Sequence, residues 1–252
     1  MECVEYVMPD GTPVRGNFIG VGLNGILMQH RPNAVLKIPK MIPTQSLEKG
    51  NEENETNQLA CQNEIGVYRR VWPHPGLVGT FKHVKQGLLL EYCYNGTLAT
   101  FISEYEQPES SLLVHWLHEL ASTILHCHDS KVLIYDLAPR NIMIANAPNE
   151  APKLIDFGQS SMFEPETEEM KSDDGCTIKC DIFNFGCLVY TIITWNVYEF
   201  DLARTKFELP KLNDLPELDG IRLEPIVEKC WNGSYTNMRE VIEAMKEVGN
   251  DE

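Results

Sequence analysis

Short apolar runs separated by turn residues dominate the first hundred positions of the chain. Such runs occur at 16–30, where glycines divide the segment, and again at 34–39, 77–81 and 87–93. Brief apolar runs bounded by glycine, proline or polar residues are typical of strands. The pattern therefore predicts a β-rich N-terminal part.

Between these strands, a polar stretch is followed by a helical pattern. Residues 44–58 are polar and acidic, which indicates a solvated loop or a mobile insertion. From near Leu59 to just before Pro73, apolar positions recur on one helical stripe: Ile65, Tyr68 and Val71. The sequence thus predicts one helix within the β-rich part.

Helical periodicity takes over in the second half. Behind a predicted serine cap at Ser110, one stripe comprises Leu113, Trp116, Leu117, Leu120, Ile124 and Leu125. Residues 181–195 are apolar on all sides, which predicts a helix buried in the middle of a domain. The last predicted helix is capped by Asn237 with Glu240 and turns Val241, Ile242, Met245 and Val248 inward.

Composition and charge narrow the possible partners. The 252 residues are 43% hydrophobic and carry a formal net charge of −16. Because nucleic acids and anionic membranes are bound by basic surfaces, neither is expected as the main partner. Eight scattered cysteines, with neither a signal-peptide pattern nor a span-length apolar run, predict a chain that is not secreted and lies in the cytoplasm or nucleus.

Candidate chemistry gathers in the segment 134–158. Asp136 and Asn141 lie five residues apart on a predicted loop, since Pro139 interrupts any helix between them. A second apolar run then leads to Asp156, fifteen residues past Asn141. A hairpin would place the three oxygen ligands around one cleft, which is chemistry for divalent cations that hold a polyphosphate.

Three glycines near the N-terminus fit the same chemistry. Gly20, Gly22 and Gly25 form Gly-x-Gly-x-x-Gly, and the chain after them is predicted to be a strand rather than a helix. The dinucleotide-binding fingerprint needs a helix there, so it does not fit. A strand-loop-strand cover over phosphates does fit. An ordinary hairpin turn is the simpler interpretation.

A lysine and a glutamate are the remaining polar candidates in the β-rich part. Lys37 lies inside an otherwise apolar strand, where the simplest interpretation is a snorkelling lysine on an edge strand. A lysine buried there needs a counter-charge, and Glu64 on the predicted helix is the best candidate. A glutamate on a helix usually faces solvent.

In order and spacing, these residues resemble the motifs of protein kinases. The resemblance covers about residues 16–195 and identifies the chain as a divergent member of the eukaryotic-type protein kinase-like family, similar to kinases of filamentous fungi. It implies an α+β, two-lobed fold. Residues 1–93 would form a small antiparallel β lobe with one main helix, which binds nucleotide, and residues 94–252 a larger helical lobe with the catalytic and Mg²⁺-binding loops.

The resemblance also implies a role for each candidate. Lys37, held by Glu64, would orient the α and β phosphates of ATP beneath the three glycines. Leu90 would be the gatekeeper, and the backbone of Glu91 and Cys93 would pair with adenine. The remaining implied roles are Mg²⁺ binding by Asn141 and Asp156, catalysis by Asp136 with help from Arg140, and anchoring of the catalytic loop by Asp181.

Several positions depart from the family pattern. Ile134 and Tyr135 stand where kinases have His-Arg, and Tyr135 carries no positive charge to bind a phosphate on the activation segment. Regulation by phosphorylation of that segment is therefore not expected. The segment 156–181 is short and lacks Ala-Pro-Glu, which puts peptide docking in question. Ala138 replaces the lysine of serine/threonine kinases, whereas Arg140 resembles the tyrosine-kinase arrangement, so acceptor type stays open.

The sequence therefore predicts an ATP- and Mg²⁺-dependent protein kinase that acts on a Ser/Thr or Tyr hydroxyl of a protein substrate. Two alternatives stay open: a pseudokinase scaffold that binds nucleotide without turnover, and a small-molecule kinase of related fold. Metal binding by His126 and His128 is not expected, because residues two apart on a helix point to different faces. Cys176 and Cys180 have a spacing seen in metal sites, but no second pair lies nearby, so a metal is not expected there either. Oligomeric state cannot be deduced.

Overall fold

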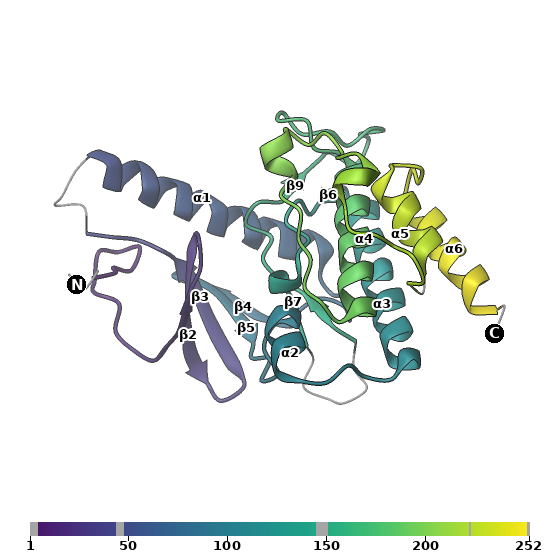
Figure 1. The fold of residues 1–252 in the computed structure, drawn as a ribbon. Helices are drawn as coiled ribbons and strands as arrows, with labels where there is room; N and C mark the ends of the chain where they lie inside the picture. The colour runs from purple at the N-terminus through teal and green to yellow at the C-terminus, as the bar shows by residue number, and fades with distance from the viewer. Residues whose placement is uncertain (1–4, 44–47, 145–150, 222, 251–252) are drawn as a thin grey trace. The chain divides into compact units, whose positions relative to one another are not determined.

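The computed structural model describes residues 5–43, 48–144, 151–221 and 223–250. These residues pack as two units. The first contains those of Met1–Trp72 together with Val78–Cys93 and Asp156–Gln159, and the second contains those of Pro73–Leu77, Tyr94–Ile155 and Ser160–Glu252. The first unit holds the main sheet and helix α1, and the second holds the other helices (Figure 1). The α+β class is confirmed, while the predicted functional boundary at residues 93 and 94 stays a prediction.

A five-stranded antiparallel sheet organises the first unit. Its strands are β1 (Phe18–Val21), β2 (Gly25–Arg31), β3 (Ala34–Pro39), β4 (Thr80–Val84) and β5 (Gly87–Glu91), in the order β1-β2-β3-β5-β4. Ile26, Met28 and Ile38 are buried together on it. The predicted strand after Gly25 is confirmed.

The strand predicted at 77–81 is wrong in its bounds, since β4 begins at Thr80. Leu77 and Val78 are buried but precede that strand, and Leu77 forms an isolated bridge with Leu154 in the second unit. β5 likewise ends at Glu91, before the predicted end at residue 93. These apolar side chains are buried by packing although they lie beyond the ends of the strands. An apolar run in the sequence looks the same in both cases, so it does not show where strand pairing begins or ends.

Helix α1 (Glu48–Val71) is longer than the pattern predicts. The expectation of a loop at 44–58 is wrong from Glu48 onward, and residues 44–47 lie outside the described residues. The reason is that polar side chains here bond backbone rather than water: Asn54 exchanges two 2.9 Å hydrogen bonds with the backbone of Ile42. Asn57 donates to the carbonyl of Lys40 at 2.7 Å. The predicted stripe, Ile65, Tyr68 and Val71, is buried as expected.

The second unit is mainly helical. Its helices are α2 (Leu98–Glu104), α3 (Ser110–Asp129), α4 (Ile178–Thr194), α5 (Glu224–Trp231) and α6 (Met238–Asn250), with 3₁₀ turns η1 (Pro139–Asn141), η2 (Leu202–Thr205) and η3 (Leu212–Asp214). The predicted apolar stripe of α3 is buried apart from half-buried Leu125. The predicted serine cap is wrong, because Ser110 is the first helical residue and Glu109, at the cap position, makes no side-chain cap bond.

Helix α4 is the buried centre that its apolar sequence predicts. It begins before Asp181, at a cap formed by Thr177 and Cys180. At Gly186 the helix packs tightly against α5, where a Cβ atom would lie 2.7 Å from Cβ of Cys230. In α6 the predicted cap is partly confirmed. Asn237 accepts the backbone N–H of Glu240 at 3.2 Å and donates through its side-chain amide to the Glu240 carboxylate at 3.1 Å, but the backbone N–H that this carboxylate accepts is that of Thr236.

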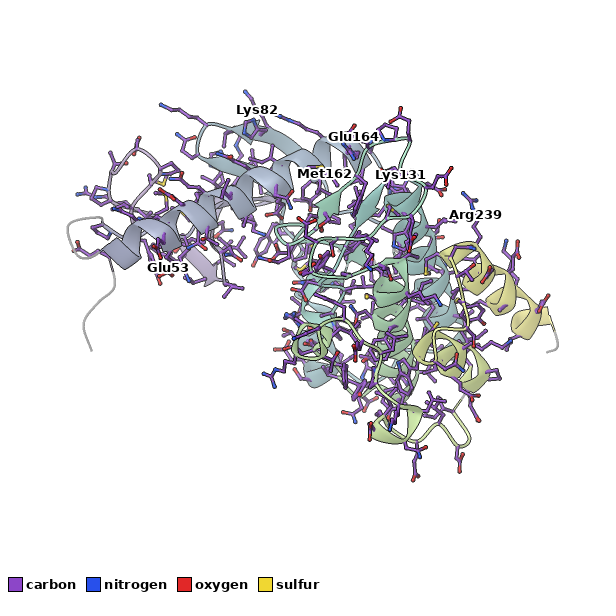
Figure 2. All side chains as sticks on the ribbon, turned by 90° about the horizontal axis from the view of Figure 1, so that it is seen from above. Glu53, Lys82, Lys131, Met162, Glu164 and Arg239 are labelled. Atoms are coloured by element: carbon purple, nitrogen blue, oxygen red, sulfur yellow. The ribbon has the colours of Figure 1, made fainter. Side chains whose placement is uncertain are left out.

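Two short ladders complete the second unit: β6 (Val132–Leu133) with β9 (Ser161–Met162), and β7 (Ile142–Met143) with β8 (Lys153–Leu154). The second ladder confirms the predicted hairpin. Beside the first, Lys131 accepts a backbone hydrogen bond from Phe163 at 2.9 Å, and Figure 2 labels Lys131 and Met162 at this edge. No helix in the described ranges is long and apolar enough to cross a membrane.

Candidate active site

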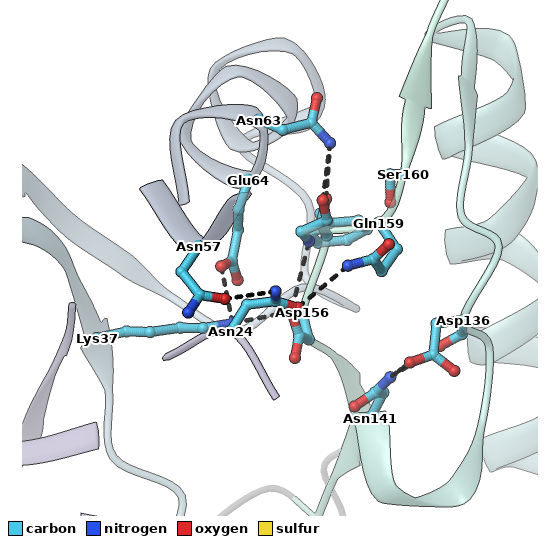
Figure 3. A network of polar contacts seen from close by, with 12 residues as sticks. Asn24, Lys37, Asn57, Asn63, Glu64, Asp136, Asn141, Asp156, Gln159 and Ser160 are labelled. Carbon is cyan, nitrogen blue, oxygen red and sulfur yellow. Dashed lines mark hydrogen bonds and ion pairs between the residues drawn. The ribbon is translucent and has the colours of Figure 1, made fainter. Parts of the chain in front are cut away.

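Lys37 lies between two carboxylates in the first unit (Figure 3). Strand β3 carries the lysine, α1 carries Glu64, and the short segment 156–159 carries Asp156. The Lys37 Nζ atom is 2.7 Å from Glu64 Oε2 and 2.9 Å from Asp156 Oδ1. The predicted pairing of Lys37 with Glu64 is therefore present, and neither residue is the solvent-facing side chain of the simpler interpretation.

Burial sets the electrostatics of this cluster. The Glu64 side chain is 2% exposed and that of Lys37 is 16% exposed. Burial opposes the ammonium form of Lys37, but Glu64 and Asp156 outweigh it and raise the pKa of the lysine above its ordinary value. Burial raises the pKa of Glu64, and the positive charge of Lys37 opposes that change. Lys37 is therefore held as a cation.

The glycine segment adjoins this lysine. An added Cβ at Gly25 would lie 3.1 Å from Lys37 Cε and 3.3 Å from the carbonyl of Ile38, so a side chain there would crowd the lysine. The backbone N–H of Gly22 donates to the carbonyl of Gly25 at 2.8 Å, which closes the turn. Gly20 lies in β1 and has room for a side chain.

Side chains that belong to none of the predicted motifs hold the glycine turn and the segment around Asp156. Asn24 donates to Asn57 of α1 at 2.7 Å and accepts from Gln159 at 3.1 Å (Figure 3). Asn63, also on α1, donates to the carbonyls of residues 157 and 158, both at 3.2 Å. The ring of Phe157 meets that of Tyr68 edge-on, with 5.1 Å between centroids. Isolated asparagines give no sequence signal for such contacts.

The predicted adenine site lies at the end of β5: Leu90 and Glu91 are the last two residues of the strand, and Cys93 follows two residues later. Leu90 and Cys93 are buried, at 6% and 5% exposed. The backbone N–H of Glu91 donates to the Gly79 carbonyl at 2.8 Å, and its carboxylate accepts from the Gly79 N–H at 3.2 Å. Glu91 is thus tied to the chain preceding β4 through both its backbone and its side chain.

A second polar cluster surrounds Asp136 in the second unit. Asn141, at the end of η1, donates 2.9 Å hydrogen bonds to both the carbonyl and Oδ2 of Asp136. Arg140 pairs with the other oxygen, Oδ1, of Asp136 and also with Glu199. The structure brings together three predicted residues and adds Glu199, which lies in the connection after α4 and was not predicted.

Asp181 fixes the backbone that precedes Asp136. Its fully buried carboxylate accepts the N–H groups of Ile134 at 2.8 Å and Tyr135 at 2.9 Å, and contacts His128 Nε2 at 2.9 Å. Asn184, one turn further along α4, donates to the Tyr135 carbonyl at 3.1 Å. These contacts hold Tyr135 at φ 69°, a conformation that is unusual for an aromatic residue and needs such support.

The ladder between β7 and β8 positions the chain that enters the Asp156 segment. Within the second unit, the N–H of Ile155 donates to the carbonyl of Asn141 at 3.0 Å. Ile155 is the residue directly before Asp156 in the chain. The hairpin is therefore present as predicted, while the joint use of Asp136, Asn141 and Asp156 stays a prediction.

Comparison with known proteins gives the family. Residues 17–208, more than half of the chain, match the model of the protein kinase domain. A fungal protein of Schizosaccharomyces pombe, "Negative regulator of sexual conjugation and meiosis", is 33% identical over 129 residues, which are 49% of this chain and 26% of that protein. This match agrees with the fungal affinity expected from the sequence.

Relatives of both acceptor classes also match. "Serine/threonine-protein kinase ATG1c" of Arabidopsis thaliana is 23% identical over 56% of this chain and 22% of its own length. "Receptor tyrosine-protein kinase erbB-4" of Homo sapiens is 23% identical over 57% of this chain and 12% of its own length. The chain thus spans about a quarter or less of these relatives. Since the domain match covers most of the sequence and both polar clusters, this chain belongs to the protein kinase family.

Proposed function

We propose that this chain is an ATP-dependent protein kinase, which transfers the γ-phosphate of Mg–ATP to a hydroxyl group of a protein. The observation that carries the proposal is the buried Lys37–Glu64 pair at 2.7 Å, in a chain whose residues 17–208 match a protein kinase domain. Phosphoryl transfer depends mainly on positioning and electrostatics, which such a fixed cation supplies.

The residues of the first unit fit a nucleotide. Lys37 would bind the α and β phosphates. A side chain at position 25 would crowd this lysine, which is consistent with glycine there. Gly20 and Gly22 would let backbone N–H groups approach phosphate oxygens. Leu90 would lie beside the adenine ring as gatekeeper. The carbonyl of Glu91 and the backbone of Cys93 would bond the adenine edge.

Carboxylate and amide oxygens are suitable ligands for Mg²⁺, and Asp156 with Asn141 would hold it. When bound, the cation neutralises phosphate charge and aligns the transferred group. The contact of Lys37 with Asp156 keeps one oxygen of that carboxylate oriented. Asn141 is oriented in turn by its two bonds to Asp136.

Asp136 would orient the acceptor hydroxyl and accept its proton. Its carboxylate is already fixed, by Asn141 on one oxygen and by Arg140 on the other. Arg140 would help to balance charge near the γ-phosphate. Besides its pair with Asp136, this arginine forms an ion pair with Glu199. The acceptor stays open between Ser/Thr and Tyr, because Ala138 departs from the serine/threonine pattern and relatives of both classes match.

The cytosol or nucleus is the compartment proposed for this kinase. Seven cysteines in the described ranges form no disulfide. Free thiols are typical of a reducing environment.

Transfer of labelled γ-phosphate from Mg–ATP to the protein itself and to a mixed protein substrate tests the proposal. Wild type is expected to transfer label, and Asp136→Asn and Lys37→Met are each expected to lose the transfer by orders of magnitude. If neither wild type nor the variants transferred label, the proposal would be contradicted. If ATP still raised the melting temperature of that silent protein, a nucleotide-binding scaffold would replace the kinase; transfer to metabolites alone would indicate a small-molecule kinase.

A further inference from the structure

Tyr135 stands directly before Asp136, and its hydroxyl group makes a contact that the proposed reaction does not use. The Tyr135 hydroxyl donates to the Oδ1 atom of Asp174, in the segment that precedes α4. The tyrosine ring packs edge-on against Phe207, with 5.4 Å between centroids. The backbone N–H of Tyr135 donates to the carboxylate of Asp181, and its carbonyl accepts from the side chain of Asn184. Tyr135 is therefore held at three places: backbone, ring and hydroxyl.

The segment on the other side of this contact is itself a closed turn, 171–177. Lys171 and Thr177 form an antiparallel bridge at its ends. Inside the turn, Ser172 donates to the same Asp174 oxygen at 2.6 Å and accepts the backbone N–H of Cys176 at 2.9 Å. Asp174 lies within this turn, so a bond to its carboxylate positions the whole segment 171–177 rather than one side chain.

The pKa shifts of Asp174 and Tyr135 are consistent with the hydrogen bond between them. Burial disfavours the ionised form of Asp174, but the hydrogen bonds from Ser172 and Tyr135 outweigh burial and lower the pKa of its carboxyl. For Tyr135, burial and then the Asp174 carboxylate raise the pKa of the phenol, so its proton stays in place. A neutral phenol donating to a carboxylate is a charge-assisted hydrogen bond, which is stronger than one between neutral groups.

We propose that the bond from Tyr135 to Asp174 is a latch that positions the turn 171–177 beside the catalytic loop, in place of a contact between an arginine and a phosphate. This proposal rests on the proposed kinase function. The latch uses only side chains of the unmodified chain, so the positioned state of the turn is the phosphate-free one. Tyr135 and Asp174 would then be positioning residues for the protein acceptor and would not touch the nucleotide.

Two nearly isosteric variants test the latch: Tyr135→Phe removes the hydroxyl and keeps the ring, and Asp174→Asn removes the charge. The matched control is Asp173→Asn, which removes the neighbouring carboxylate from the same turn. Each latch variant is expected to lower kcat/KM for the protein acceptor by roughly tenfold, mainly through KM, and to leave KM for ATP unchanged. The double variant should lose no more than the stronger single variant, because both remove one interaction.

Hydrogen exchange of residues 171–177 provides a readout that needs no activity. Faster exchange in both latch variants, but not in Asp173→Asn, is the expected result. If hydrogen exchange of residues 171–177 is unchanged in both latch variants, the latch does not exist, regardless of their activity. If exchange is faster but the KM for the protein acceptor is unchanged in an active enzyme, the latch does not position the acceptor. If Tyr135→Phe does not fold, the same comparison is made with Asp174→Asn alone. A wild type that transfers no phosphate refutes the proposed function, while the exchange data still decide whether the latch exists.

Discussion

At the scale of single residues, Lys37 contacts two carboxylates, although its side chain is only 16% exposed. The two contacts have different environments, because the Glu64 side chain is 2% exposed whereas that of Asp156 is 45% exposed. Removing a partner from a buried ion pair leaves an uncompensated charge and is costly. Glu64 is therefore expected to matter for both stability and nucleotide binding.

The substitution Glu64→Gln keeps the volume of the side chain but removes its charge. We expect kcat/KM for ATP to fall by roughly a hundredfold or more, because Lys37 loses the partner that orients it. The rise in melting temperature on adding Mg–ATP should shrink in parallel. Steady-state kinetics and thermal unfolding measure the two effects.

Glu53→Gln is the matched control for this prediction. Glu53 also lies on α1 (Figure 2). Its side chain is 52% exposed, and its ion pair with Lys40 is longer, at 3.5 Å. An exposed pair of this kind contributes about 0–1 kcal/mol to stability. Equal effects of the two substitutions would contradict the special role of Glu64.

The sequence predicts the residues of both polar clusters but not the groups that support them. Lys37, Glu64, Asp136 and Asn141 could be chosen because their spacing along the chain carries the pattern. Glu199 and Asp174 could not, because a carboxylate in an acidic, irregular segment gives no signal of a specific contact. Their partners become visible only when the fold brings distant segments together.

At the scale of secondary-structure elements, the packing of α4 against α5 depends on Gly186. A Cβ atom at this position would lie 2.7 Å from Cys230 Cβ and 3.0 Å from Trp231 Cδ1. We predict that Gly186→Ala destabilises the folded chain by about 1–3 kcal/mol through overpacking. Urea unfolding measures the change. Helix propensity alone predicts the opposite sign, so a stabilised variant would show that α4 and α5 do not pack as described.

The cap of α4 leads to a pH prediction. A hydrogen bond from the Cys176 thiol lowers the pKa of Cys180 from its ordinary 9.0 to about 7, against the effect of burial. Because the pKa is depressed in the folded state, the stabilisation is fully present above the unfolded value of 9.0 and is lost as pH falls through 7.

Wild type and Cys180→Ser, whose hydroxyl does not ionise in this range, are the pair to compare. The difference in unfolding free energy between them should grow in favour of wild type as pH rises from 6 to 9. Urea unfolding at each pH provides the measurement. A difference that is independent of pH would show that Cys180 does not ionise in the cap.

Element boundaries were harder to predict than element types. The apolar stripes of α1, α3 and α4 are present because burial follows helical periodicity directly. The first three turns of α1 were missed because Asn54 and Asn57, which are polar, bond backbone groups and are 4% and 2% exposed. The start of β4 was predicted too early because Leu77 and Val78 are buried although they lie before the strand begins at Thr80.

At the scale of the whole molecule, the order of the motifs predicted the α+β class and the family. A glycine turn, a strand lysine, a helix glutamate and the loop of Asp136 and Asn141 follow one another over most of the chain. No single motif contains the information that lies in this order. Acceptor identity is different, since under the proposed function it would depend on the surface around Asp136 and on the turn 171–177. Neither of these follows from motif spacing.

The proposed kinase activity is tested most directly by the rate of γ-phosphate transfer in a single turnover at saturating Mg–ATP, for wild type and Asp136→Asn. We expect the protein acceptor to gain label from γ-labelled but not from α-labelled ATP. The variant is expected to bind Mg–ATP with wild-type affinity but to transfer phosphate orders of magnitude more slowly. Equal rates for the two proteins, or binding without any transfer by wild type, would contradict the proposed activity.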